Sequence, residues 1–135
     1  MKFQLESGDG QNLFSGYGDG YVAVNGTRYE KSVVVTAQRV IEDWRVEDWQ
    51  ALRAEHFEFL LGLGPEIVLL GTGSKLRFPP PRLTQCLAQA RVGLETMDTA
   101  AACRTYNILS AEGRNVVAAV LPGRAAAPAS SRPAS

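Results

Sequence analysis

The alternation of apolar strands and amphipathic helices in the second half of the chain constrains the fold more than any other feature. Short links join three stretches of strand length and two segments of helical spacing, a pattern typical of crossover units in a largely parallel sheet. The strands are expected at Glu66 to Leu70, Gly93 to Met97 and Asn115 to Leu121, and the helices from Pro79–Pro81 to about Arg91 and from Asp98 to about Ala111.

The first third of the chain carries strand signals separated by glycine-rich turns. Asn25-Gly26 indicates a hairpin, because a type I′ turn needs positive φ at both central positions. We therefore expect an antiparallel meander, followed by an amphipathic helix from Glu47 to about Leu63. The strands are expected at Phe3 to Glu6, Leu13 to Tyr17, Tyr21 to Val24, Ser32 to Thr36 and Arg39 to Trp44, and the helix would align Trp49, Leu52, His56, Phe59 and Leu60.

Composition and length indicate one α/β domain. The chain has 135 residues, of which 45% are hydrophobic, and residues 1–122 are predicted to form a single unit. Residues 123–135 contain no large apolar side chain, so we expect a disordered tail. Acidic and basic side chains number 14 each, so no net field favours nucleic acid or an anionic membrane. Short apolar runs and a polar N-terminus predict a cytoplasmic protein without direct membrane insertion.

The cysteines and the histidine fit packing better than catalysis. Cys86 and Cys103 stand 17 residues apart without a CxxC pattern, and His56 is the only histidine. His56 is aligned with apolar neighbours, and Cys103 follows the small residues Ala101 and Ala102. We therefore predict no catalytic residue, no metal site and no cofactor. The arginines are scattered without a basic, aromatic face, so nucleic-acid binding is not expected either.

Residues 69–80, LLGTGSKLRFPP, resemble the beginning of a phosphate-binding loop. The loop nevertheless matches neither GxxxxGK[ST] nor GxGxxG. Pro79, Pro80 and Pro81 also remove backbone donors where the next helix begins. A tight turn after a buried strand is therefore favoured. In the alternative, the amides of the glycine loop hold a small anion together with Lys75 or Arg77.

A candidate ligand site follows from the parallel strands, because their carboxyl ends lie on one side of the sheet. The glycine loop would then lie near Asp98, which is also a strong helix N-cap. In a ligand site Asp98 would accept a hydrogen bond or a proton. The candidate ligand-binding residues are Gly71, Thr72, Gly73, Ser74, Lys75, Arg77, Asp98, Thr99 and Arg104.

Three stretches taken together resemble the Mth-type domain family. They are VTAQRVIEDW, PEIVLLGTGSKLRFPP and GLETMDTAAACRTYNILSAEGRNVVAAVLP, and the likeness covers about residues 10 to 122. The family includes the mitochondrial complex I assembly factor 3, the adipogenesis-associated Mth domain protein and uncharacterised bacterial members. The resemblance implies a layered fold with a central mixed sheet flanked by about three helices. Because the mitochondrial member acts through protein partners, the resemblance also implies a protein partner for this chain.

Two functions follow from these observations. The favoured one is a non-enzymatic protein-interaction or assembly module of the bacterial cytoplasm. The alternative is a protein that binds a small anionic ligand, or is weakly catalytic, with its site between the Gly71-Thr72-Gly73 loop and the helix that starts at Asp98.

Overall fold

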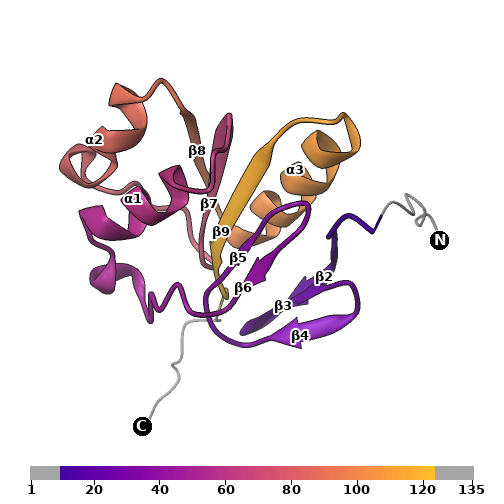
Figure 1. The fold of residues 1–135 in the computed structure, drawn as a ribbon. Coiled ribbons are helices and arrows are strands. Elements are labelled where there is room, and N and C mark those ends of the chain that lie inside the picture. The colour runs from indigo at the N-terminus through magenta and orange to yellow at the C-terminus, as the bar shows by residue number, and fades with distance from the viewer. Residues whose placement is uncertain (1–9, 124–135) are drawn as a thin grey trace, which may run out of the picture.

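A mixed five-stranded sheet forms the centre of the computed structural model, which describes residues 10–123 (Figure 1). The strand order is β6-β5-β9-β7-β8. β7 runs parallel to β8 and β9, whereas β5 runs antiparallel to β6 and β9. The α/β class and the parallel arrangement of the last three strands are thus confirmed. The bounds are Val33–Val35 for β5, Val40–Ile41 for β6, Ile67–Thr72 for β7, Gly93–Met97 for β8 and Val116–Leu121 for β9.

Three helices cover the two faces of this sheet, as the family resemblance implied. α1 (Ala54–Leu61) and α2 (Pro81–Gln89) lie on one face, and α3 (Thr99–Ala111) lies on the other (Figure 1). Successive residues of β7 alternate between these layers: Leu70 packs with α1 and α2, and Leu69 packs with α3. A strand covered on both faces must be apolar at every position, which explains the uninterrupted apolar runs in the sequence.

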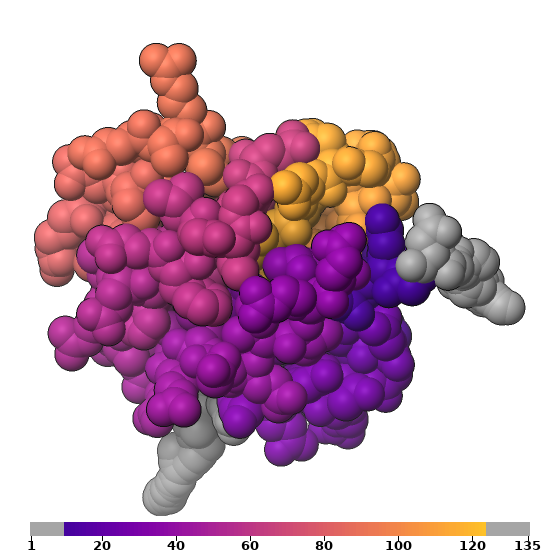
Figure 2. Space-filling view, in the orientation of Figure 1, coloured from indigo at the N-terminus to yellow at the C-terminus, as the bar shows by residue number. Residues whose placement is uncertain are grey.

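A second, three-stranded antiparallel sheet packs on the α3 side. It contains β2 (Phe14–Gly18), β3 (Tyr21–Val24) and β4 (Thr27–Tyr29). Asn25 and Gly26 join β3 to β4 with φ values of 52° and 87°, as the predicted turn requires. The surfaces of this sheet, in indigo to violet, and of α3, in orange, adjoin in the space-filling view (Figure 2).

The prediction of one continuous meander was wrong in its second half. The predicted strands at 32–36 and 39–44 shorten to β5 and β6 and join the central sheet, whereas β4 was not predicted. The three valines of β5 are all fully buried. Such a strand needs cover on both faces, which the small antiparallel sheet does not provide but the central sheet does.

The predicted helix from Glu47 to Leu63 is also divided. A short 3-10 turn (Trp49–Ala51) precedes α1, and Arg53 between them is extended. The Asp48 carboxylate accepts the Ala51 N–H at 3.0 Å and so caps the turn. The Arg53 N–H donates to His56 Nδ1 at 3.0 Å and so starts a separate helix. Two local caps therefore replace one long helix.

The buried face of α1 also differs from the prediction. Phe57 and Leu60 are fully buried, whereas Phe59 is 41% exposed. Because the helix is interrupted at Arg53, the residues of α1 are not in helical register with Trp49. The face predicted by counting from Trp49 therefore includes Phe59, which is not in the core. The predicted strand Phe3 to Glu6 and the tail after Gly123 lie outside the described residues.

Candidate functional site

The carboxyl ends of β7, β8 and β9 bring three loops together at one end of the molecule. The loop after β7 begins at Gly73, β8 leads through Asp98 into α3, and β9 continues to Gly123. The Thr99 N–H donates to the Gly73 carbonyl at 2.9 Å. The structure thus brings together the glycine loop and the helix start, which we predicted from the sequence to form one candidate site.

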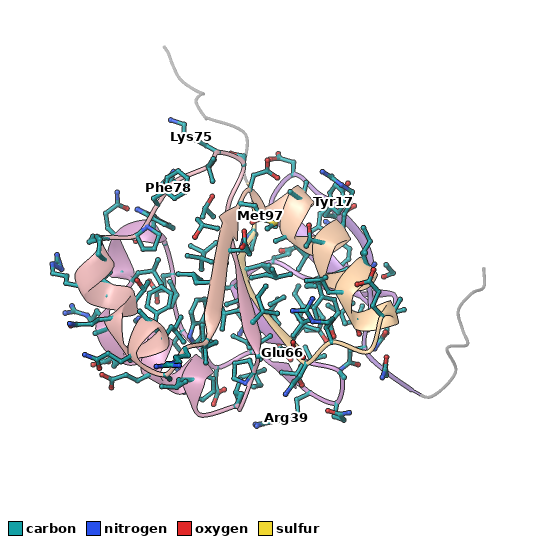
Figure 3. The ribbon with its side chains drawn as sticks, turned by 90° about the horizontal axis from the view of Figure 1, so that it is seen from above. Tyr17, Arg39, Glu66, Lys75, Phe78 and Met97 are labelled. Atoms are coloured by element: carbon teal, nitrogen blue, oxygen red, sulfur yellow. The ribbon has the colours of Figure 1, made fainter. Side chains whose placement is uncertain are left out.

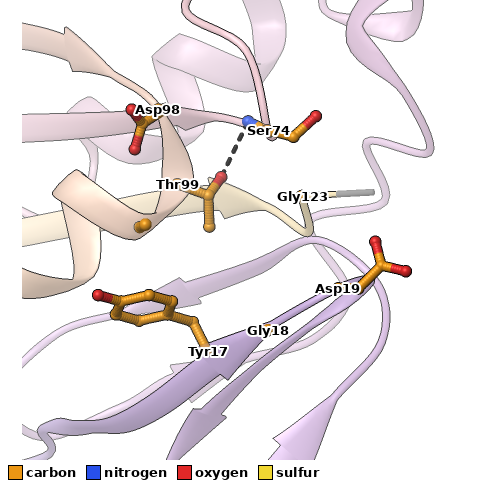
Figure 4. Close-up of a pocket in the computed structure, with 9 residues that line it drawn as sticks. Tyr17, Gly18, Asp19, Ser74, Asp98, Thr99 and Gly123 are labelled. Atoms are coloured by element: carbon orange, nitrogen blue, oxygen red, sulfur yellow. Dashed lines mark hydrogen bonds between the residues drawn. The ribbon is translucent and has the colours of Figure 1, made fainter. Parts of the chain in front are cut away.

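Thr99 joins all three loops through its side chain. Its Oγ1 accepts the Gly73 N–H at 2.9 Å, drawn as a dashed line in Figure 4, and donates to the Leu121 carbonyl. Thr99 is only 3% exposed. Because its hydroxyl already accepts one hydrogen bond and donates another inside the protein, its position is that of a structural clamp.

Gly71 and Thr72 shape this end of the sheet from below the surface. A Cβ at Gly71 would lie 2.8 Å from Val120 Cγ1, so only glycine fits there without rearrangement. The Thr72 hydroxyl donates to the Lys75 carbonyl at 2.7 Å and accepts the Arg77 N–H at 3.3 Å. Both residues are buried and organise the loop.

An open cavity of about 400 Å³ lies between these loops and the tip of the β2–β3 hairpin. Residues 17–19 line one side, and residues 73–74, 98–100 and Gly123 line the other (Figure 4). Four of the candidate residues therefore border one cavity: Gly73, Ser74, Asp98 and Thr99.

Two charged side chains lie at or beside this cavity, Asp98 in its lining and Arg104 next to Tyr17. The Asp98 carboxylate accepts the Ala101 N–H at 2.8 Å, so Asp98 is the helix cap that its position predicted. Arg104 donates from Nη1 to the Tyr17 hydroxyl at 2.9 Å. This hydrogen bond, with a further contribution from the negative charge of Asp98, raises the pKa of Arg104. Arg104 is thus a permanent cation beside the cavity.

The helix start offers less to an anion than the sequence indicated. The N–H groups of Thr99 and Ala101 donate to acceptors within the protein. Asp98 also places a negative charge where an anion would meet the helix dipole. The Asp98 charge acts on Arg104, whose pKa it helps to raise.

Lys75 and Arg77 do not line this cavity. Lys75 extends away from the body of the molecule (Figure 3). The Arg77 guanidinium lies 5.8 Å from the centroid of the Trp49 ring. Arg77 and Trp49 border a second cavity of about 430 Å³ together with Glu47 and Asp48.

Sequence reasoning did not include Tyr17 or the hairpin tip in the site. In the sequence, Gly18-Asp19-Gly20 indicates only a turn between two strands, and Tyr17 is only the last residue of the strand before it. Tyr17 and Arg104 are 87 positions apart, and their contact depends on how the small sheet packs against α3. Only a pairing between distant segments would have pointed to it.

Large apolar side chains are also exposed outside the cavities. Leu76 is 50% exposed and Phe78 is 71% exposed, both in the segment that follows the glycine turn. Ile108, on the outer face of α3, is 59% exposed. We call residues 75–78 the exposed loop.

Cys103 and His56 lie in packed surroundings. Cys103 is 1% exposed, and burial raises the pKa of its thiol to about 12 despite the nearby Arg104. Such a thiol is almost entirely protonated at neutral pH and is a poor nucleophile. The His56 ring contacts Trp44 edge-on, with 5.8 Å between the ring centroids.

Between residues 10 and 123, no three His, Cys, Asp or Glu side chains gather closely enough to hold a metal ion. None of the helices in that range has the length and apolar character needed to cross a bilayer.

The molecule is therefore a layered α/β domain with a small antiparallel sheet and an open cavity at the carboxyl edge of its central sheet. The chain belongs to the family described as a protein of unknown function (DUF498/DUF598), whose model matches residues 14–121. This match confirms the resemblance to Mth-type domains, since similar solved structures are described as Mth938-like.

Solved structures and other sequences agree with this assignment. A crystal structure from Bordetella parapertussis is 40% identical, with a TM-score of 0.79 over 83% of this chain and 96% of that one. The Mth938-like domain from Bordetella pertussis is 32% identical, with a TM-score of 0.77 over 93% and 96%. The 13 kDa major membrane protein of Francisella tularensis is 32% identical over 86% of this chain and 95% of its own length.

A bovine relative is named NADH dehydrogenase [ubiquinone] 1 alpha subcomplex assembly factor 3. It is 35% identical over 73% of this chain, and the match covers 54% of the bovine protein. The chain therefore spans about half the length of this relative.

Proposed function

We propose that the protein is a non-enzymatic protein-interaction or assembly module of the bacterial cytoplasm. The observation that carries the proposal is the similarity of 73% of the chain to a protein named as an assembly factor. The match covers only part of the bovine relative. The feature that the two proteins would share is therefore a surface of this domain that binds protein partners.

The edge of the central sheet beside α3 supports this function. β8 is the last strand of the sheet and pairs with β7 on one side. An edge strand presents backbone donors and acceptors to which a partner can add a strand. α3 packs against β8 and carries the exposed Ile108. An open strand edge, and an exposed apolar side chain on the helix that packs against that strand, are suitable features for docking a protein.

Site-specific photo-crosslinking in cells of the source organism tests this proposal. A photoreactive phenylalanine analogue at position 108 should give light-dependent adducts with one or a few proteins, which mass spectrometry identifies. The same analogue at position 39, an exposed residue in the turn between β5 and β6, serves as the control. Absence of adducts at position 108, together with no partner enriched by affinity purification, would refute the proposal.

The cavity supports a second candidate, binding of a small anionic ligand. Arg104 lies beside Tyr17, which lines the cavity, and Gly73 and Ser74 line the opposite wall. Asp98 acts against this candidate, so we rank it second. A thermal-shift screen with phosphates, nucleotides and carboxylates tests it, because a ligand of the folded form raises the melting midpoint. A true ligand should lose its effect in Arg104→Gln but keep it in Arg39→Gln.

A further inference from the structure

Although the chain has no net charge, one segment of it contains basic residues but no acidic ones. Residues 67–94 contain Lys75, Arg77, Arg82 and Arg91 but no aspartate or glutamate. This segment includes β7, the exposed loop and α2. A local positive field can therefore exist here although the chain as a whole is neutral.

The exposed loop combines this charge with large apolar side chains. Leu76 and Phe78 are 50% and 71% exposed, and Lys75 is exposed beside them. Arg77, between the two apolar residues, turns back toward the Trp49 ring. The exposed fractions of Leu76 and Phe78 place both side chains on the outward side of this segment.

The loop is held in a defined shape. Thr72 binds it at two points, through the Lys75 carbonyl and the Arg77 N–H. Residues 79–81 are prolines, which restrict φ in the chain that leads into α2. An interaction through Leu76 and Phe78 would therefore cost little conformational entropy.

The prolines at 79–81 favour a lipid surface over a protein that would add a β-strand. They lack backbone N–H groups, so the chain from the exposed loop to α2 cannot donate a full set of hydrogen bonds to an added strand. For the same reason, fewer polar backbone donors would lose water if the segment entered an apolar interface. A protruding pair of apolar side chains with adjacent cations suits the boundary between lipid headgroups and acyl chains.

We propose that the exposed loop docks the protein onto an anionic lipid surface. Leu76 and Phe78 enter the headgroup boundary, while Lys75 and Arg82, which is exposed in the first turn of α2, lie at the level of the lipid phosphates. Phe78 and Lys75 lie at the end of the molecule opposite Glu66 and Arg39 (Figure 3), so docking would leave that other end facing water.

Acidic side chains lie on the inner side of the loop. Glu30, Glu47 and Asp48 line the cavity that Arg77 also borders, and Asp48 is engaged as a helix cap. They reduce the contribution of Arg77 to lipid attraction, whereas Lys75 does not line that cavity. We therefore expect weak, reversible binding, since even a full acyl anchor gives only marginal affinity by itself.

Co-sedimentation of the purified full chain with lipid vesicles tests this inference. The protein should sediment with vesicles of phosphatidylcholine containing about one third phosphatidylglycerol at low salt, with a bound fraction that rises over the millimolar lipid range. Binding should fall at least about fivefold at roughly 0.5 M salt, because the charges are screened. Vesicles of phosphatidylcholine alone should bind much less.

Matched variants separate the loop from the rest of the surface. Phe78→Ser should lower the lipid partition coefficient about tenfold, because it removes an aromatic side chain from the apolar boundary. Lys75→Gln should lower it about fivefold, the effect expected for one cation near an anionic surface. Ile108→Ser and Arg39→Gln, which alter exposed apolar and basic positions elsewhere, should leave it unchanged.

Three results would overturn the inference. One is the absence of sedimentation with anionic vesicles at several millimolar lipid. Another is an equal loss of binding in Phe78→Ser and Ile108→Ser, which would indicate nonspecific adhesion. The third is a photo-crosslink from position 78 to an acidic protein in cells, without any to lipid. The inference does not depend on the proposed assembly function, because the vesicle assay contains no protein partner.

Discussion

Gly71 on β7 lies so close to Thr99 at the start of α3 that a Cβ at position 71 would be 3.1 Å from the Thr99 hydroxyl oxygen. The same Cβ would lie 3.2 Å from Ala102 Cβ in the next turn of the helix. Glycine on the strand and small residues on the helix thus allow α3 to approach the sheet closely. This approach places Thr99 within reach of the loops after both β7 and β9.

Gly71→Ala should destabilise the protein. The added methyl group would be 2.8 Å from Val120 Cγ1, so the helix or the strand must move, at a cost of about 1–3 kcal/mol in the free energy of unfolding. Urea denaturation should show a lower midpoint with an unchanged slope. Gly16→Ala is the control, because no atom lies within 4 Å of a Cβ at that position. Equal midpoints for Gly71→Ala and the wild type would contradict the packing argument.

Thr99→Val should be more destabilising than Thr99→Ser. Valine keeps the shape of the side chain but leaves the Gly73 N–H and the Leu121 carbonyl without their partner, at a cost of about 2–4 kcal/mol. Serine keeps the hydroxyl and loses only a buried methyl group, at a cost of about 1 kcal/mol. Chemical denaturation of both variants gives the order. The reverse order would mean that packing of the methyl group matters more than the hydrogen bonds.

The stability of the protein should decrease as the pH is lowered, because of His56. Burial, and to a smaller extent Arg53, lowers the pKa of His56 below its ordinary value of 6.5, while Glu55 opposes the change. The unfolded chain therefore binds a proton more readily than the folded protein does. The stabilisation is present above about pH 6.5 and is lost as the pH falls toward the lower folded-state pKa.

Melting temperatures between about pH 5.5 and 7.5 measure this effect, since the histidine titrates in that window. His56→Gln is the matched variant. Glutamine can accept the Arg53 N–H as histidine does, but it does not titrate in this range. The variant should show a smaller decrease in melting temperature than the wild type over the same interval. Identical pH profiles would exclude His56 as the source.

Cys103 should resist thiol reagents in the folded protein. Cys86→Ser leaves Cys103 as the only cysteine, and its thiol is buried with a pKa raised to about 12. At about pH 8, its reaction with a disulfide reagent should be at least about a hundredfold slower than in denaturant, because both the thiolate fraction and access are reduced. Rapid reaction in the folded Cys86→Ser variant would contradict the burial of Cys103.

Local patterns in the sequence were sufficient for much of the second half of the fold. The apolar runs at β7 and β9, the cap at Asp98 and the turn at Asn25-Gly26 all depend on residues within a few positions of each other. Caps and turns are local hydrogen-bonding arrangements, and burial on both faces makes a strand continuously apolar. For these reasons the boundaries of α3 and the parallel sheet could be predicted from the sequence.

The tertiary structure decided which distant segments meet. The Asn107 amide, for example, accepts the Phe14 N–H at 2.9 Å and donates to the Phe14 carbonyl at 2.8 Å, which fixes β2 to α3 across 93 positions. The same packing brings Tyr17 to Arg104 and so creates one wall of the cavity. β5 likewise joins β9 because its valines need cover on both faces. A local sequence pattern indicates that a side chain is buried or hydrogen-bonded. The identity of its partner depends on which faces of the helices and sheets pack together.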